Sequence, residues 1–361
     1  MVSAYFLKRI YLSFATHVFD VPARLAAFLL FLLLIFFPVT NPTSQILLLL
    51  TLANLGAIFA VSWDLLVGRT GLMSLGHAVF FGLGAYVTAL LFVHLGLPPY
   101  ITIPLSIPVG VLVALIVGFP SLRVKGPYLS LISFAFPLIL TGIIYYFKEY
   151  IGGERGLYGL PSFFPFLPYK DQFLAEYWFT LLLLFISGVI IYRIANSETG
   201  IVLVSILDDE LASKASGINV TKYKIMTFVI SGIFATIAGS VQAHILRVAN
   251  TGMLEATISF IPVIVTIFGG IGTLYGPIVG AYFLQLLDGY VLGRIITIPP
   301  DWVYAKMLVY ALIIIILIIL WPRGVARFVT DKLEDLEEAR DIDERGSKIW
   351  KKYKKKKEKV V

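Results

Sequence analysis

The residue types that most often do chemistry in proteins are sparse in this sequence. Its four histidines (His17, His77, His94 and His244) form no H-E-x-x-H motif and have no carboxylate at ligand spacing. There is no cysteine, which removes thiolate nucleophiles and sulfur ligands, so we predict no metal site. The sequence also lacks a G-x-S-x-G motif, and it lacks the phosphate-binding loop G-x-x-x-x-G-K-[ST] because no Gly-Lys pair occurs. These absences predict that the chain is not an enzyme.

A few charged residues stand inside or beside long apolar stretches, where charge is costly and often functional. Asp64 and Arg69 lie near one end of such a stretch, and we expect them to snorkel or to pair with each other. Asp288, with Gln285 one turn earlier, lies deeper in its stretch. It would either meet a substrate ammonium or pair with Arg294, and the sequence leaves both open.

The composition shows what surrounds these residues. The chain has 361 residues, of which 58% are hydrophobic and 14% charged, and its mean hydropathy is +0.89. Soluble domains carry about 25% charged residues, so this is an integral membrane protein. The net charge of +7 comes with lysines clustered at the C-terminus. Positive charge beside membrane spans indicates topology and lipid attraction rather than nucleic-acid binding.

The apolar residues come in blocks, and a membrane span needs roughly 20 of them. About ten candidate spans follow from this rule, although 72–95 carries glycines that predict a break and 258–268 is short enough to be re-entrant. We therefore expect an all-α, polytopic transmembrane helical bundle of about 8–10 spans, with re-entrant or broken helices. The stretches are 25–39, 45–67, 72–95, 101–119, 128–147, 177–194, 225–246, 258–268, 278–292 and 303–321.

The domain organisation follows from these spans. Residues 1–24 are expected to form an N-terminal interfacial or cytoplasmic segment, and 25–325 the transmembrane domain. Residues 326–361 form a charged, lysine-rich tail that contacts anionic lipid or remains solvated. Loop charges place both termini in the cytoplasm of a multi-pass protein of the cell membrane. The polar loop 196–224 then faces the cytoplasm, and the loop 148–176 faces outward.

The inward loop predicts a short amphipathic helix over 199–217. Ser197 or Thr199 is placed to cap its start, and Gly217 to stop it. Such a helix either lies on lipid headgroups or docks in the groove of a partner protein. Anionic lipid would repel the acidic run 208–210, so we favour a protein partner. Val204, Leu207, Leu211 and Ala215 form its apolar stripe.

Glycine and small residues recur at spacing four in two later segments. Ser231, Ala235 and Gly239 are one run, and Gly272, Gly276 and Gly280 are another. This spacing is typical of helices in close contact. The stretch 269–276 is alternatively non-helical backbone that lines a cavity, as is the stretch 74–77. The candidate path-lining residues are Ser74, Gly76, His77, Gly269, Gly270, Gly272 and Asp288.

Several stretches resemble, in the same order, the branched-chain amino acid permeases of the LivM type. The longest is DDELASKASGINVTKYKIMTFVISGIFATIAGS, within the inward loop and the span after it. The resemblance covers roughly 25–325, and the collinearity makes it specific. The other stretches are GLMSLGHAVFFGLGAY at 71–86, LRVKGPYLSLISFAF at 122–136, GGERGLYGLP at 152–161, GGIGTLYGPIVGA at 269–281 and WPRG at 321–324.

The resemblance implies the permease subunit of an ABC importer for branched-chain amino acids. Two cytoplasmic ATPase subunits would use ATP and Mg²⁺ and this chain would hold no cofactor. A second homologous permease and an external solute-binding protein, docking near 152–161, complete the implied assembly. The implied ATPase-coupling residues are Gly200, Val204, Leu207, Asp208, Asp209, Glu210, Leu211, Ala212, Ala215 and Gly217.

The sequence departs from the family pattern at Ile201 and Leu207, where basic residues are usual, and at Leu138, where a glutamate is common. Polar contacts to an ATPase must therefore differ in detail, and Leu138 is assigned no role. Similar permeases carry urea and short amides, which leaves the substrate open. A secondary transporter working without ATP is the alternative from another class. It would need its own ion site, for which only Asp64 and Asp288 are available.

Overall fold

The computed structural model describes residues 31–122, 124, 127–295 and 303–328. They fall into two units, 42–324 and a second unit that contains both ends of the chain. In the second unit, residues 31–36 are α-helical and η1 (Phe37–Thr40) is a 3-10 helix. The predicted N-terminal segment 1–24 lies outside the described residues, as does the tail beyond residue 328.

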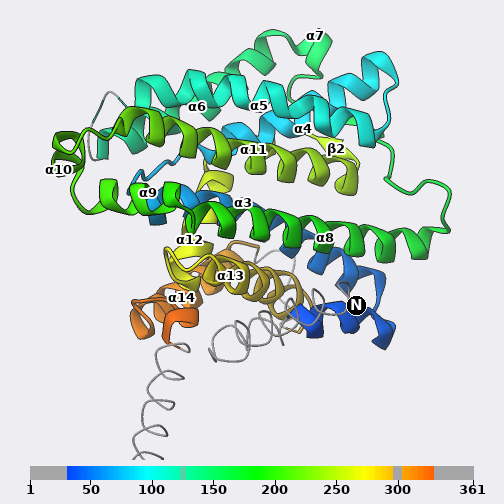
Figure 1. The fold of residues 1–361 in the computed structure, drawn as a ribbon. Helices are drawn as coiled ribbons and strands as arrows, with labels where there is room; N and C mark the ends of the chain where they lie inside the picture. The colour runs from blue at the N-terminus through cyan, green and yellow to red at the C-terminus, as the bar shows by residue number, and fades with distance from the viewer. Residues whose placement is uncertain (1–30, 123, 125–126, 296–302, 329–361) are drawn as a thin grey trace, which may run out of the picture. The chain divides into compact units, whose positions relative to one another are not determined.

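The unit 42–324 is a bundle of helices (Figure 1). Among the described residues, β structure is limited to β1 (Leu157–Tyr158) and β2 (Val248–Ala249), which pair antiparallel. The 3-10 helix η2 (Thr251–Leu254) precedes α12, and the π-helix η3 (Leu287–Ile295) continues α13. The helices are α3 (Ser44–Thr70), α4 (His77–Leu95), α5 (Pro99–Ser121), α6 (Pro127–Tyr146), α7 (Lys148–Ile151), α8 (Tyr169–Ala195), α9 (Glu198–Asp208), α10 (Glu210–Ala215), α11 (Val220–Leu246), α12 (Ala256–Gly269), α13 (Tyr275–Leu286) and α14 (Val303–Leu320).

Seven described helices are long and apolar enough to cross a membrane. They are α3, α4, α5, α6, α8, α11 and the C-terminal stretch Leu308–Phe328. The all-α polytopic class predicted from the sequence is therefore confirmed. The predicted interruptions are also present, because residues 71–76 are non-helical and α4 begins only at His77. Helix α12 has 14 residues, too few to cross about 30 Å of hydrocarbon.

One boundary was predicted wrongly. The sequence placed the outward loop over 148–176, but α8 begins at Tyr169 behind Pro168. Its first turns carry Lys170 and Asp171, and a rule that starts a span at its first apolar block omits such turns. The loop between α7 and α8 is correspondingly shorter.

Helix α3 occupies the centre of the bundle, where it packs against α8, α11, α12 and α13 (Figure 1). Its side chains Phe59 and Trp63 are among the largest fully buried side chains of the described chain. The bundle has two ends with different elements. The α10 end carries α9, α10 and the turns 71–76 and 270–274, and the β1 end carries β1 and β2.

Glycines set the distance between α4 and α11. A Cβ on Gly239 would lie 1.9 Å from the carbonyl oxygen of Phe81, and one on Gly84 would lie 2.1 Å from that of Thr236. Both backbones are therefore in direct contact. The small-residue spacing at Ser231, Ala235 and Gly239 serves this packing, and all three residues are buried.

Candidate functional site

The predicted coupling helix 199–217 is two helices, and this part of the prediction was wrong. Helix α9 ends at Asp208, and α10 begins at Glu210. Asp209 between them is extended, at φ −152° and ψ 105°. Its carboxylate accepts hydrogen bonds from the backbone N–H groups of Leu211 (2.8 Å) and Ala212 (3.0 Å). An aspartate is a strong N-cap, so it starts a new helix instead of continuing the old one.

Helix α9 is fixed to the bundle by one face. Leu203 and Ile206 are buried, and Gly200 is so close to the end of α8 that a Cβ would lie 2.0 Å from the carbonyl oxygen of Ala195. These residues are not the predicted apolar stripe. In that stripe Leu207 and Leu211 are exposed, by 42% and 70%.

The remaining predicted coupling residues lie largely on the surface of the same α9–α10 pair. Val204 and Glu210 are partly buried, and Ile201 adds a further exposed apolar side chain. Exposed apolar side chains outside the membrane-length helices mark interaction sites when they gather on one element. The exposed predicted residues are Leu207, Asp208, Asp209, Leu211, Ala212, Ala215 and Gly217.

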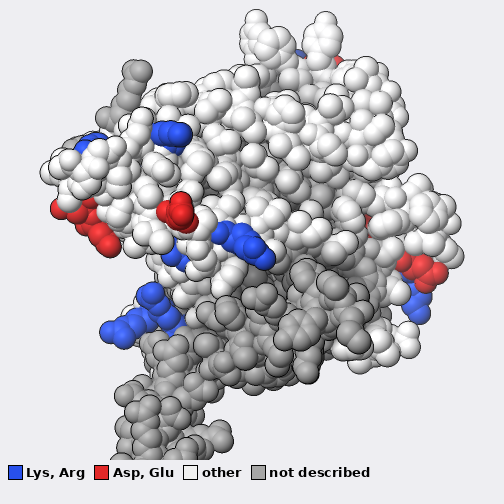
Figure 2. All heavy atoms as spheres, in the orientation of Figure 1, with Lys and Arg blue, Asp and Glu red and all other residues white. Residues whose placement is uncertain are grey.

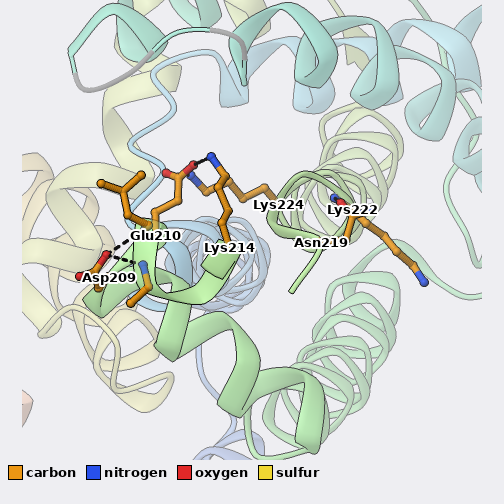
Figure 3. Close-up of polar contacts among 8 residues, drawn as sticks. Asp209, Glu210, Lys214, Asn219, Lys222 and Lys224 are labelled. Carbon is orange, nitrogen blue, oxygen red and sulfur yellow. Dashed lines mark hydrogen bonds and ion pairs between the residues drawn. The ribbon is translucent and has the colours of Figure 1, made fainter. Parts of the chain in front are cut away.

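Glu210 pairs with two lysines, one in α10 itself and one in α11 (Figure 3). Its carboxylate oxygens lie 2.7 Å from Nζ of Lys214, one turn later in α10, and 2.6 Å from Nζ of Lys224 in α11. Hydrogen bonds from Lys214 and then Lys224 lower the pKa of Glu210 from 4.5 to about 2. The carboxylate therefore stays ionised at any physiological pH, and α10 keeps its attachment.

This attachment gives a pH prediction. A carboxylate whose pKa is lower in the folded state stabilises it above the unfolded pKa of 4.5, and that stabilisation is lost as pH falls toward about 2. We expect the difference in Tm between the wild type and Glu210→Gln to stay constant from about pH 8 to pH 5 and then to shrink. The free-energy difference should be at most about 1 kcal/mol, because the pair is near the surface. A difference that instead grows toward acid pH would contradict the assignment.

Asp64 joins α3 to the turn between α12 and α13. It is buried, and its carboxylate accepts hydrogen bonds from the backbone N–H of Gly272 (2.7 Å) and of Leu274 (3.2 Å). The expectation that Asp64 would snorkel is therefore wrong. The reason is that residues 270–274 are non-helical, so their N–H groups need acceptors, and Asp64 accepts hydrogen bonds from two of them.

Asp64→Ala is expected to destabilise the protein by about 2–5 kcal/mol, because one buried and one partly buried N–H group lose their acceptor. Asp64→Asn retains one carbonyl oxygen and should fall between the wild type and alanine. The measurement is thermal unfolding of the detergent-solubilised chain. Asp288→Ala is the matched control, since Asp288 is 51% exposed and pairs with Lys306 at 3.0 Å, and it should cost less than about 1 kcal/mol.

The same helix also holds the other interrupted segment. Trp63, next to Asp64, donates its indole N–H to the carbonyl oxygen of Ser74 at 2.7 Å. Adjacent residues of α3 thus fasten both non-helical turns at the α10 end. The end of α3 in turn contacts α9, because a Cβ on Gly71 would lie 2.9 Å from the Leu207 side chain.

The predicted path-lining residues of the first turn are packed in this conformation. Ser74, Gly76 and His77 are buried, and His77 Nε2 lies 2.8 Å from the Ser231 hydroxyl oxygen. A Cβ on Gly76 would lie 2.1 Å from the carbonyl oxygen of Ser133. These contacts explain the residue types by packing, and a role in the path stays a prediction.

In the second turn, residues 270–274, the backbone is non-helical, which was one of the two alternatives for this stretch. Gly270 has φ +118° and Gly272 φ +77°, conformations that favour glycine. Gly269 and Gly270 are buried, and a Cβ on Gly324 would lie 2.4 Å from the Gly270 Cα. Close backbone packing accounts for these glycines as well.

Asp288 has a partner other than the predicted one. It lies in the π-helix η3 and pairs with Lys306 of α14, whereas the side chain of Arg294 lies outside the described residues. Within the described parts of the chain no group of three or more histidine and carboxylate side chains is placed to hold a metal ion. His244 instead lies 3.0 Å from the carbonyl oxygen of Pro161 through Nδ1, which must donate there.

Two acidic residues of the site region were missed. Glu176, assigned to a loop, is buried in α8 and accepts a hydrogen bond from Ser162 at 2.9 Å. Glu255, between two predicted spans, precedes α12 and is exposed. The sequence did offer one signal, because each glutamate lies close to long apolar stretches. The depth of each side chain in the bundle, however, depends on tertiary packing.

Membrane-length helices combined with non-helical turns inside the bundle are typical of membrane transporters. A family model described as "Branched-chain amino acid transport system / permease component" matches residues 45–317. The chain belongs to this family of transport permeases. No solved structure matches it.

Its relatives among characterised proteins are distant. The high-affinity branched-chain amino acid transport system permease protein LivM of Salmonella typhimurium is 26% identical over an alignment of 257 positions, which covers 65% of this chain and 60% of that protein. The chain thus matches less than two thirds of the length of this relative. A probable branched-chain amino acid permease protein LivH of Methanocaldococcus jannaschii is 23% identical over 66% of this chain and 78% of its own length. The fructose import permease protein FrcC of Rhizobium meliloti is 31% identical, over 37% of this chain and 38% of that protein.

Proposed function

We propose that this chain is the membrane-spanning subunit of an ABC importer that carries branched-chain or related amino acids. The observation that supports this most is the α9–α10 pair. It presents exposed Leu207 and Leu211 outside the membrane-length helices, and it is anchored to α3 and α11. A surface that receives force from a partner needs both properties, an apolar contact area and a rigid connection to the bundle.

The contacts offer a route for that force. A displaced α9 would push on the end of α3 where Leu207 meets Gly71. Asp64 and Trp63 would pass the displacement of α3 to the turns 270–274 and 71–76. These turns begin or end α4, α12 and α13, so movement there would alter access to the bundle from one side.

The chain's own residues contribute no covalent step in this proposal. ATP and Mg²⁺ would be used by two ATPase subunits in the cytoplasm, in contact with α9 and α10. The α10 end would therefore face the cytoplasm, with both termini on that side. In the view of Figure 2, most basic and acidic side chains lie in the left half of the face and at its right edge, and the described surface between them is white, as expected of a membrane-embedded zone.

The other proposed partners are a second, homologous permease and an extracytoplasmic solute-binding protein. The binding protein would meet the β1 end, where Tyr158 and Phe166 are exposed. Membrane lipid would cover the exposed apolar faces of the long helices. The family description and the LivM and LivH relatives favour branched-chain amino acids, while the partial match to a fructose permease keeps other small solutes as outcomes of the test.

The test is purification of the tagged, solubilised chain from its native host, with co-purified proteins identified by mass spectrometry. An ATPase pair and a second permease are expected. The complex is then reconstituted in proteoliposomes with the binding protein, and uptake of leucine is measured with and without ATP. Recovery of the chain alone, with solute flux that needs no ATP, would overturn the proposal in favour of a secondary transporter.

A further inference from the structure

The segment between α11 and α12 turns back into the bundle. Val248 and Ala249 pair with β1 at one end of the molecule. Only a few residues later, Leu254 packs on Gly82, where a Cβ would lie 2.4 Å from Leu254 Cδ2. About 20 Å of helix separate Gly82 from the end of α4 at Leu95, at 1.5 Å per residue. The start of α12 therefore lies at the depth of the hydrocarbon layer, which is about 30 Å thick.

A second set of contacts confirms this depth. Gly84, half a turn beyond Gly82, contacts Thr236 of α11, and Thr236 in turn contacts Gly110. Gly110 stands midway along α5, between Pro99 and Ser121. The N-terminus of α12 is thus level with the middle of the neighbouring spans.

Glu255 occupies this position, and its side chain is exposed. Its carboxylate does not cap α12, since no backbone N–H of the helix donates to the side chain. Its hydrogen bond is from the Thr257 hydroxyl at 3.4 Å, and no ion pair with Glu255 occurs among the described residues. Thr257 is exposed as well.

A charged side chain at this depth is not stable against lipid and normally faces the bundle interior or water. The main chain at the start of α12 is subject to the same restriction, because no side chain caps the first N–H groups of this helix. The two observations are independent, because one concerns a side chain and the other the main chain, and both require a polar environment on the same side.

We propose that Glu255 lines the aqueous translocation pathway and forms a mid-membrane contact for the ammonium group of a zwitterionic substrate. The inference deepens the proposed function and rests on it for the substrate class. A carboxylate attracts the ammonium group and leaves the apolar side chain of the substrate to the neighbouring Phe260 and Ile261, which are 40% and 41% exposed. Release requires only that this single contact be broken.

The absence of cysteine from this chain permits a direct test. Glu255→Cys is the first variant, and Thr257→Cys is a second reporter in case the first fails to assemble. Leu312→Cys, at an exposed apolar position of α14, represents lipid. Tyr158→Cys, in the β1 end, represents bulk water. Each is reconstituted in the native complex and treated with the charged methanethiosulfonates, cationic and anionic, before modification of this chain is quantified by mass spectrometry.

The thiol of Glu255→Cys is expected to be modified much faster than that of Leu312→Cys, in the resting or the ATP-cycling complex. The thiol of Thr257→Cys, in a chain that retains Glu255, is expected to react faster with the cationic than with the anionic reagent. If 255 and 257 react no faster than 312 in both states, while 158 reacts, the proposal is overturned. The comparison of modification rates does not depend on which solute is carried.

The charge is tested separately by leucine uptake. Glu255→Gln is expected to lower ATP-driven uptake about tenfold, the loss that corresponds to one charge-assisted contact. Glu255→Asp should recover most of it, which a purely structural role for the side chain would not predict. Equal uptake by wild type and Glu255→Gln would overturn the ammonium contact. If the wild-type complex carries no leucine, the proposed function fails, and the thiol result still reports whether the path reaches Glu255.

Discussion

Replacement of Gly239 by alanine is expected to abolish the folded bundle. The added Cβ would lie 1.9 Å from the carbonyl oxygen of Phe81 and 2.6 Å from its carbonyl carbon. Both partners are helix backbone, so no side chain can rotate away, and α4 and α11 would have to separate along their buried contact. We expect a cost of at least about 3 kcal/mol, comparable with severe overpacking of a core. Size-exclusion chromatography of the solubilised chain should show loss of the monodisperse peak.

Gly188→Ala is the matched control for this change. Gly188 lies within α8, another long apolar helix, and a Cβ there would have nothing within 4 Å. The same substitution should be neutral or stabilise the helix by up to about 1 kcal/mol, since alanine is the better helix former. A Gly239→Ala protein with the Tm of the Gly188→Ala protein would show that α4 and α11 are not in backbone contact.

The second large effect is expected at Leu211. Its side chain is 70% exposed on α10, and its removal leaves the fold almost unchanged because it packs little within the chain. In the proposed complex it would be buried by an ATPase subunit, and apolar anchors of this kind carry much of an interface's binding energy. Leu211→Ala should therefore lower ATP-driven uptake and co-purification of the ATPase by about tenfold or more, which is about 1.4 kcal/mol or more.

Leu182→Ala provides the comparison for Leu211. Leu182 is 57% exposed on α8, within a membrane-length helix, and its truncation should leave both uptake and co-purification near the wild-type values. A Leu211→Ala complex that retains its ATPase and its uptake would exclude α10 as the docking element. The folded yield of both variants, measured first, separates loss of coupling from loss of protein.

The sequence was sufficient for the class of the fold and for the location of the polar loop. Blocks of apolar residues reveal long helices because length and hydropathy are local properties. The break before His77 was also predicted, and the break after Gly269 was one of two alternatives, since glycines disfavour a continuous helix.

What depends on distant contacts could not be predicted. The buried bonds of Asp64 were not predicted, because its partners Gly272 and Leu274 are remote in sequence. The capping hydrogen bond of Asp209 divides the expected helix in two. The spacing of apolar residues gives no information on whether a residue caps a new helix or continues the old one. Glu255 was not singled out from the sequence, because its depth follows from the packing of Leu254 on Gly82.

The attachment of both turns to neighbouring residues of α3 has a consequence for biosynthesis. The partner of Trp63, Ser74, is synthesised only 11 residues later, whereas the partner of Asp64, Gly272, is synthesised 208 residues later. At about 5–20 residues per second, roughly 10–40 s pass before that partner leaves the ribosome. The two hydrogen bonds from this turn to Asp64 therefore form only after most of the chain has been synthesised.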